Sequence, residues 1–122
     1  MHMNEIATAV RQKLPLIEVI VNNHVLGMVR QWQDLFYEKR YSATVLDDGV
    51  DYVKLAEAMG ATGYRATTRE AFNEALKAAL AAKTPVVIDC VIGCDDKVWP
   101  MVAPGADIST AFTGEDLAAA QS

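Results

Sequence analysis

The sequence predicts an α/β fold, an open and mostly parallel sheet with helices on both faces. Three observations lead to this class: short β-branched apolar runs, amphipathic segments of helical period between them, and polar turn residues at the junctions. Because apolar strands that alternate with helices are typical of parallel β-α units, a single sheet covered on both sides is favoured. The length of 122 residues predicts one domain, and no stretch reads as a linker that would divide it.

The first elements are a short helix, a strand and a longer helix. We interpret residues 1–2 as a cloning remnant, after which Ile6 to Lys13 follows helical spacing until Pro15 ends the segment. The run Leu16–Val21 is almost wholly apolar, which predicts a central strand covered on both faces. From Val25 to Glu38, apolar residues recur at intervals of three and four and predict an amphipathic helix.

The rest of the chain continues the alternation and then loses it. In order, we expect a loop, a helix, a short strand, a helix and a strand, over Tyr41–Gly49, Val50–Met59, Tyr64–Ala66, Arg69–Ala82 and Val86–Ile92. The first of these helices is expected to be capped by Asp48 or Gly49 and to end at Gly60, and the second to be capped by Thr68. Residues 106–122 are expected to be a weakly structured tail. Three strands make a narrow sheet, and apolar strands at its edges would leave unpaired backbone exposed. The chain is therefore expected to be part of a larger domain or to self-associate.

Charge and cysteine usage exclude several classes of protein. Eleven Lys and Arg against sixteen Asp and Glu give a net charge of −5, which argues against binding to nucleic acid. No apolar run is long enough to span a bilayer, and the pattern of a signal peptide is missing, so no membrane partner is expected. Cys90 and Cys94 have no His near them in sequence, and we interpret them as thiols in a reducing, cytoplasmic environment.

One polar pair stands where an open α/β sheet binds its ligands. Asn22 and Asn23 follow the first predicted strand and directly precede a helix. Ligands bind beyond the carboxyl ends of parallel strands, and a helix N-terminus favours an anion such as a diphosphate. An Asn side-chain oxygen suits Mg²⁺, which commonly bridges protein oxygens to phosphates. From the residues alone, the pair is weak evidence, and an ordinary turn and helix cap is the favoured interpretation.

The surrounding sequence resembles a known family. The run from Leu16 to Ser42 closely resembles the thiamine-diphosphate domain of the acetolactate (acetohydroxyacid) synthase large subunit, most narrowly in GMVRQWQ at residues 27–33 and LFY at residues 35–37. The similarity continues through residues 54–60 and 84–88 to residues 100–105, and so covers nearly all of this chain but only the last part of that subunit. The family's cofactor motif opens with Gly-Asp-Gly and closes with Asn-Asn, and only the closing half is present here. The chain also departs from the family where Asn4 and Glu5 are adjacent, since two residues normally separate them.

The resemblance implies a cofactor and a metal site. The side-chain oxygen of Asn23 and the carbonyl of Val25 would bind Mg²⁺, whereas the third ligand, the Asp of Gly-Asp-Gly, is not in this chain. Gly27 would let the backbone pass close to the diphosphate, and Met28 would pack near the cofactor. The family's catalytic glutamate belongs to another domain and another subunit. No catalytic residue is therefore expected in this chain.

The resemblance also implies a substrate and inhibitor pocket on the following helix. Val29, Trp32 and Phe36 would line the substrate approach, where the family's herbicide inhibitors also bind. From periodicity alone, a stripe of such residues at helical spacing is more typical of a plain core. His24 is interpreted as an exposed loop histidine without a catalytic role.

By resemblance, the parent protein would condense two pyruvates, or pyruvate with 2-oxobutyrate, with release of CO₂ in branched-chain amino-acid synthesis. It would use thiamine diphosphate and Mg²⁺, with FAD bound by a domain that this chain lacks, and would form at least a dimer, with a regulatory small subunit as a further partner. The isolated fragment is expected to be inactive. Two alternatives stay open: another thiamine-diphosphate carboligase or decarboxylase, such as glyoxylate carboligase, and a non-catalytic α/β fragment that only self-associates.

Overall fold

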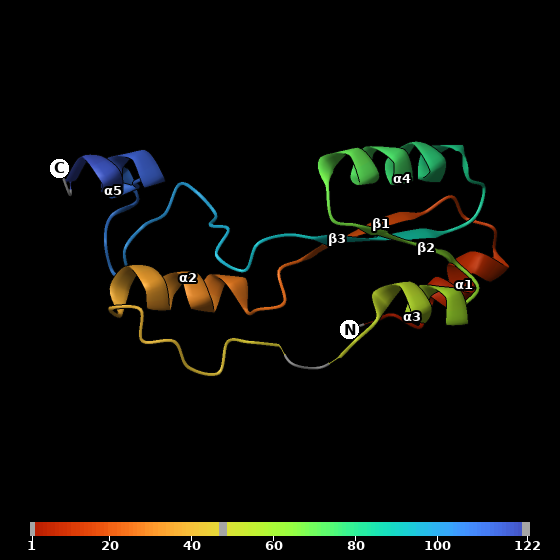
Figure 1. Cartoon of the computed structure of the whole chain (residues 1–122), viewed down its shortest axis with the longest axis horizontal. Coiled ribbons are helices and arrows are strands. Elements are labelled where there is room, and N and C mark those ends of the chain that lie inside the picture. The colour runs from red at the N-terminus through yellow and green to blue at the C-terminus, as the bar shows by residue number, and fades with distance from the viewer. Residues whose placement is uncertain (1, 47–48, 121–122) are drawn as a thin grey trace. The chain divides into compact units, whose positions relative to one another are not determined.

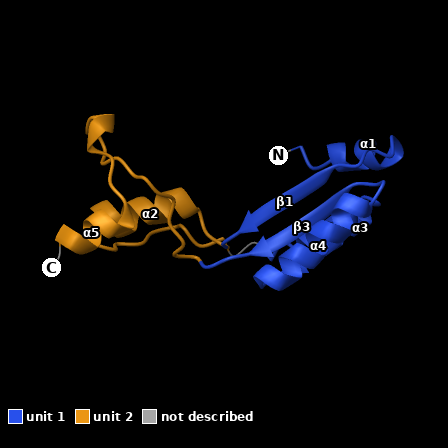
Figure 2. Cartoon of the chain, turned by 90° about the horizontal axis from the view of Figure 1, so that it is seen from above, with its two compact units in different colours: residues 1–23, 47–93 blue, residues 24–46, 94–122 orange. Residues whose placement is uncertain are grey.

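The chain forms two compact units. The structure, a computed structural model, describes residues 2–46 and 49–120. Unit 1 consists of residues 1–23 and 47–93, and unit 2 consists of residues 24–46 and 94–122 (Figure 2). The sequence predicted one domain without a dividing linker. Hydrophobic periodicity reports local structure and not which segments contact one another, so it did not reveal this division.

Unit 1 contains the predicted α/β sheet. Strands β1 (Ile17–Asn22), β2 (Thr62–Ala66) and β3 (Val86–Val91) are parallel and lie in the order β1-β3-β2. Helix α4 (Arg69–Ala81) covers one face, and α1 (Glu5–Arg11) and α3 (Tyr52–Ala58) cover the other (Figure 1). The expected fold class, a mostly parallel sheet with helices on both faces, is confirmed.

The core lies on both faces of the central strand. Under α4, small side chains of that helix pack on Val86 and Ile88, and Ile88 is fully buried. On the opposite face, Val87 packs with Ile6 of α1 and Ala56 of α3. Because successive residues of β3 point to opposite faces, this one strand supplies the middle of both apolar layers.

The prediction that Leu16–Val21 is a central strand was wrong. The segment forms β1, which lies at one end of the strand order, and only β3 has a neighbour on each side. Val19 and Val21 are accordingly 39% and 66% exposed. The composition of the run suits a strand covered on both faces, but periodicity does not report whether the covering segments belong to this chain.

Two boundaries in unit 1 differ from those predicted for physical reasons. Helix α3 begins at Tyr52 because the side chain of Asp51 caps it by accepting a hydrogen bond from the Lys54 N–H at 3.2 Å. Of the caps predicted instead, Gly49 precedes this position and Asp48 lies outside the described residues. Strand β2 begins at Thr62, two residues before the predicted start at Tyr64, and so includes Gly63. A Cβ at Gly63 would lie 2.9 Å from the Cγ1 and the carbonyl oxygen of Val53. Glycine is therefore needed there for α3 to approach the sheet.

Unit 2 is built around α2 (Gly27–Phe36). This helix begins two residues after the predicted start because Val25 instead forms an antiparallel bridge with Val45. The tail that was expected to be weakly structured contains a 3-10 turn, η1 (Ile108–Thr110), and a helix, α5 (Gly114–Ala120). None of the described residues from 106 to 120 is buried, which explains why no apolar periodicity marked these elements.

Candidate functional site

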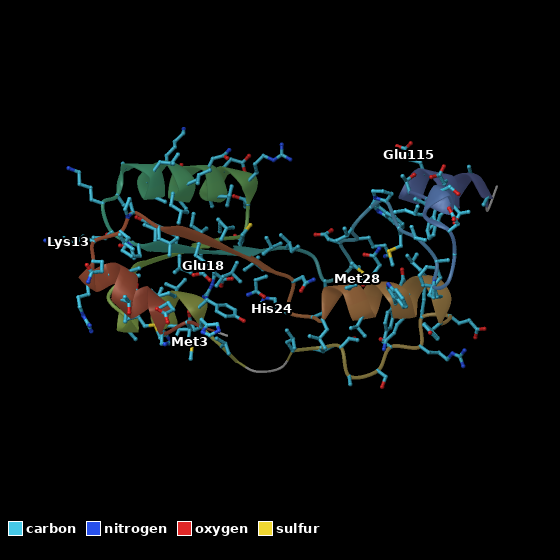
Figure 3. All side chains as sticks on the ribbon, turned by 180° about the vertical axis from the view of Figure 1, so that it is seen from behind. Met3, Lys13, Glu18, His24, Met28 and Glu115 are labelled. Atoms are coloured by element: carbon cyan, nitrogen blue, oxygen red, sulfur yellow. The ribbon has the colours of Figure 1, made fainter. Side chains whose placement is uncertain are left out.

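Helix α2 exposes an apolar surface rather than burying it. Met28 and Val29, in its first turn, are each 49% exposed (Figure 3 labels Met28). An open cavity of about 580 Å³ lies against this helix and is lined by Met28, Val29, Trp32, Gln33, Tyr37 and Arg40. The structure thus brings Met28, Val29 and Trp32 together on one wall. This wall is mostly apolar, with the Arg40 side chain as a cationic group on it.

Phe36 does not line this cavity, although it was predicted to share the wall with Val29 and Trp32. It packs edge-to-face on Trp32, with ring centroids 5.9 Å apart, and on Phe112, at 6.3 Å. Trp99 also packs on Phe112, with ring centroids 5.9 Å apart. Phe36 therefore belongs to an aromatic cluster that supports Trp32, since edge-to-face pairs fix ring orientation as well as burying area.

Gln31 fixes α2 to the chain segment that follows Cys94. It is the buried residue of this helix, 4% exposed, and its amide makes two hydrogen bonds to one residue. Its Nε2 donates to the carbonyl of Val98 at 2.9 Å, and its Oε1 accepts from the N–H of Val98 at 2.8 Å. Gln31 was not among the residues predicted from the sequence. The available signal was the position of Gln31, a polar residue directly before Trp32 within an amphipathic helix.

Charged side chains reinforce the same attachment. Arg30 pairs with Asp95 at 2.7 Å and lies over the ring of Tyr41 at 4.1 Å. The Tyr41 hydroxyl donates to Asp34 at 2.8 Å, and Lys97 approaches Asp34 at 2.8 Å. The hydrogen bond from Lys97 lowers the pKa of Asp34 against the opposing effect of burial, and Asp34 in turn raises the pKa of Tyr41. These contacts hold α2 to Tyr41 on one side of the sequence and to the segment Asp95–Lys97 on the other.

The predicted metal ligands flank a strained backbone position. Asn22 ends β1 and Asn23 follows it, while His24 has φ of 57°, which a side chain other than glycine rarely adopts (Figure 3 labels His24). His24 is exposed, as predicted, and Val25 is 7% exposed. An amide oxygen and a backbone carbonyl are the neutral oxygen donors that Mg²⁺ accepts beside phosphate and water. In donor chemistry, Asn23 and Val25 therefore fit a magnesium–diphosphate group. Among the described residues, no cluster of three or more His, Cys, Asp or Glu side chains offers another metal site.

A row of polar side chains crosses the carboxyl end of the sheet in unit 1. Asp89 of β3, only 2% exposed, accepts from Asn22 Nδ2 at 2.9 Å and from Arg65 Nε of β2 at 3.1 Å. Arg65 also donates to Asp51 at 2.8 Å, and these two carboxylates raise the pKa of the guanidinium group. Neither Asp89 nor Arg65 was predicted from the sequence to belong to a site. A charged residue within the apolar run Val86–Ile92 was the signal that could have found the first of them.

The two cysteines lie near the end of β3 and shortly after it. Cys90 is partly buried and Cys94 is exposed, and both are free thiols. Over the described ranges 2–46 and 49–120, no helix combines the length and apolar character needed to cross a bilayer.

Comparisons with known proteins agree on one family. Residues 1–90 match the family described as "Thiamine pyrophosphate enzyme, C-terminal TPP binding domain". The chain is 47% identical over 106 residues to an acetolactate synthase of Mycobacterium avium, which covers 83% of this chain and 17% of that protein. It is 41% identical over 109 residues to the acetolactate synthase isozyme 2 large subunit of Escherichia coli K12, covering 89% of this chain and 20% of that protein.

Solved structures of related enzymes share the fold. A thiamine diphosphate-dependent 4-hydroxybenzoylformate decarboxylase of Rhodococcus jostii RHA1 matches with a TM-score of 0.66 and 30% identity, over 75% of this chain and 17% of that one. A benzoylformate decarboxylase from Polynucleobacter necessarius matches with a TM-score of 0.68 and 28% identity, over 78% and 18%. The chain thus spans about a fifth or less of the length of these proteins.

Proposed function

Since this chain belongs to the family of C-terminal TPP-binding domains of thiamine pyrophosphate enzymes, we propose that it is the cofactor-binding segment of an acetolactate synthase catalytic subunit. The observation that carries this proposal is the identity of 41–47% to acetolactate synthases, against 28–30% to the two decarboxylases of the same fold. The whole subunit would condense two pyruvates, or pyruvate with 2-oxobutyrate, and release CO₂. Another carboligase or decarboxylase is the less favoured reading for the same reason.

In this proposal, the residues around the end of β1 hold the cofactor. Asn23 contributes its side-chain oxygen and Val25 its carbonyl oxygen to Mg²⁺, and Gly27 and Met28 at the start of α2 lie along the cofactor. Thiamine diphosphate, when bound, supplies the nucleophilic carbon and stabilises the negative charge that develops after decarboxylation. The protein's share is to position the diphosphate and to exclude water.

The apolar wall of α2 would then form one side of the substrate approach. Val29 and Trp32 line the 580 Å³ cavity, and the support of Trp32 by Phe36 fits a rigid wall. Arg40 gives that cavity a cationic group, which suits the carboxylate shared by pyruvate and 2-oxobutyrate. No described residue of this chain is proposed as an acid, base or nucleophile.

We also propose further attributes of the whole subunit. They are a role in branched-chain amino-acid synthesis, a cytoplasmic location, FAD held outside these 122 residues, assembly into at least a dimer and association with a regulatory small subunit. The open edge of β1 supports self-assembly, since an exposed apolar edge is unusual in a soluble monomer.

A segment exchange tests the proposal directly. The matching 106 residues of the Mycobacterium avium acetolactate synthase are replaced by those of this chain, and the chimeric enzyme is assayed for acetolactate formed from pyruvate. We expect product formation that requires thiamine diphosphate and Mg²⁺. A folded chimera that consumes pyruvate but yields acetaldehyde would favour a decarboxylase instead. A folded chimera that consumes no pyruvate would refute the proposed function.

A further inference from the structure

Asp89 is a buried charge in a position that suits an apolar side chain. It lies in the central strand, where Val87 is 3% exposed and Ile88 is fully buried, and it is itself 2% exposed. Removing a carboxylate from water costs free energy that a single ion pair often fails to recover. A contact that needs a hydrogen-bond acceptor at this point of β3 therefore has to explain the presence of a polar side chain.

Arg65 alone does not supply that explanation. Its side chain is 46% exposed and is already paired with Asp51 at 2.8 Å, so it has a carboxylate partner without Asp89. An exposed arginine can also be solvated by water. Asp89 also accepts a hydrogen bond from Asn22 at 2.9 Å, and this bond joins the side chains of two neighbouring strands, β1 and β3.

The bond to Asp89 determines how the Asn22 amide is turned. Asn22 Nδ2 donates to one carboxylate oxygen of Asp89 at 2.9 Å and Arg65 Nε donates to the other at 3.1 Å, so the NH₂ group of Asn22 faces Asp89. The planar amide then directs its oxygen away from β3. The backbone of the same residue is also bound to the end of this strand, because the N–H of Ile92 donates to the Asn22 carbonyl at 2.9 Å.

From this geometry we infer that Asp89 is a positioning residue, which holds Asn22 through its side chain and thereby holds the adjacent Asn23 where a metal ion can bind it. The part that concerns the metal rests on the proposed function. The part that concerns Asn22 rests only on unit 1, in which all four residues of the row lie. Arg65 donates hydrogen bonds to both Asp89 and Asp51, and Asp51 links the row to the start of α3.

The first test reads the side chain of Asn22 by NMR in the 122-residue chain. In Asp89→Leu we expect the Asn22 side-chain amide protons to exchange about tenfold faster or more, because their acceptor is gone, and the Asn23 backbone amide to shift. Asp89→Asn should preserve both signals, since its amide oxygen can still accept from Asn22. Asp51→Asn is the matched control, because it removes the other carboxylate beside Arg65 while an Asn still caps α3. Unchanged Asn22 signals in Asp89→Leu, or an equal shift in Asp51→Asn, would overturn the inference.

The second test measures the cofactor requirement in the chimeric enzyme. Asp89→Leu should raise the half-saturating Mg²⁺ concentration by about 10- to 100-fold, the loss typical when the support of a metal ligand is removed. The rate at saturating cofactor should stay within about twofold. Asn22→Ala leaves the Asp89–Arg65 pair intact and should raise the half-saturating Mg²⁺ concentration to a similar extent. If Asp89→Leu does not fold, this second variant tests whether Asn22 supports the metal site. A lower maximal rate with an unchanged Mg²⁺ requirement would overturn the inference. If the unsubstituted chimera forms no acetolactate, the proposed function fails, whereas the NMR measurement still decides whether Asp89 holds Asn22.

Discussion

Two glutamines on α2 make the same pair of hydrogen bonds in different surroundings. Gln31, 4% exposed, bonds both backbone groups of Val98, and Gln33 bonds both backbone groups of Ser42 at 3.1 Å in an exposed setting. Replacing either glutamine by Met keeps the length of the side chain and removes both bonds. The two variants therefore differ mainly in whether the glutamine side chain that is replaced is buried.

The expected magnitudes follow from this difference. A hydrogen bond within a protein contributes roughly 1 kcal/mol net, so Gln31→Met should lower the free energy of unfolding by about 2 kcal/mol. Gln33→Met should lower it by less than about 1 kcal/mol, because water can bond the backbone of Ser42 in the exposed site. The Trp32 wall should be displaced in the first variant and not in the second, since Gln31 attaches α2 to residue 98.

Tryptophan fluorescence during urea unfolding measures both variants. The chain has two tryptophans, Trp32 and Trp99, and both lie in unit 2, so their emission reports on the unit that contains α2. The slope of unfolding free energy against urea should be the same for both variants, which would show that the change is in stability. If Gln33→Met costs as much as Gln31→Met, burial does not decide the strength of these bonds and the reasoning fails.

Three further predictions concern the pocket, acid stability and assembly. In the chimera, Trp32→Leu should retain acetolactate formation but weaken flat aromatic inhibitors by about tenfold or more, because only they stack on the ring; equal loss of both with unfolding would indicate a core role instead. The pKa of Asp34 is lowered from its ordinary 3.8, so its stabilising contribution should be complete above that pH and vanish as pH falls through the lower, folded value. Urea unfolding of Asp34→Asn should thus approach that of the unsubstituted chain below about pH 4, and a difference that grows in acid would contradict this. Light scattering over a dilution series should give a mass above 13.3 kDa for the unsubstituted chain, and a lower mass for Val21→Lys, which puts a charge on the exposed edge strand. A mass of 13.3 kDa for the unsubstituted chain at high micromolar concentration would refute self-association.

Local sequence patterns predicted the elements better than their surroundings. The strands, the four main helices and the Thr68 cap could be predicted because each depends on residues a few positions apart, and the Thr68 side chain indeed accepts from the Ala71 N–H at 3.1 Å. The edge position of β1 could not, since it depends on pairing with β3 far along the chain.

The candidate site divides in the same way. Trp32 and Val29 could be placed on one helix face from their spacing, and the structure puts both in the same cavity. Gln31 and Asp89 could not be identified, because each is defined by a partner about 67 residues away, at Val98 and Asn22. Asn23 and Val25 as metal ligands remain a prediction, supported by donor chemistry alone.

The strand order has a consequence for the time course of synthesis. β3 is the last strand to be made and lies between the other two, with Ile17 of β1 paired to Val86. At roughly 5–20 residues per second, β1 waits several seconds on the ribosome before its partner exists. During that interval the valines of β1 have no neighbouring strand from this chain. A nascent chain that stops before residue 86 contains two of the three strands and yet no sheet, so the last third of the polypeptide decides whether the first two thirds fold or aggregate.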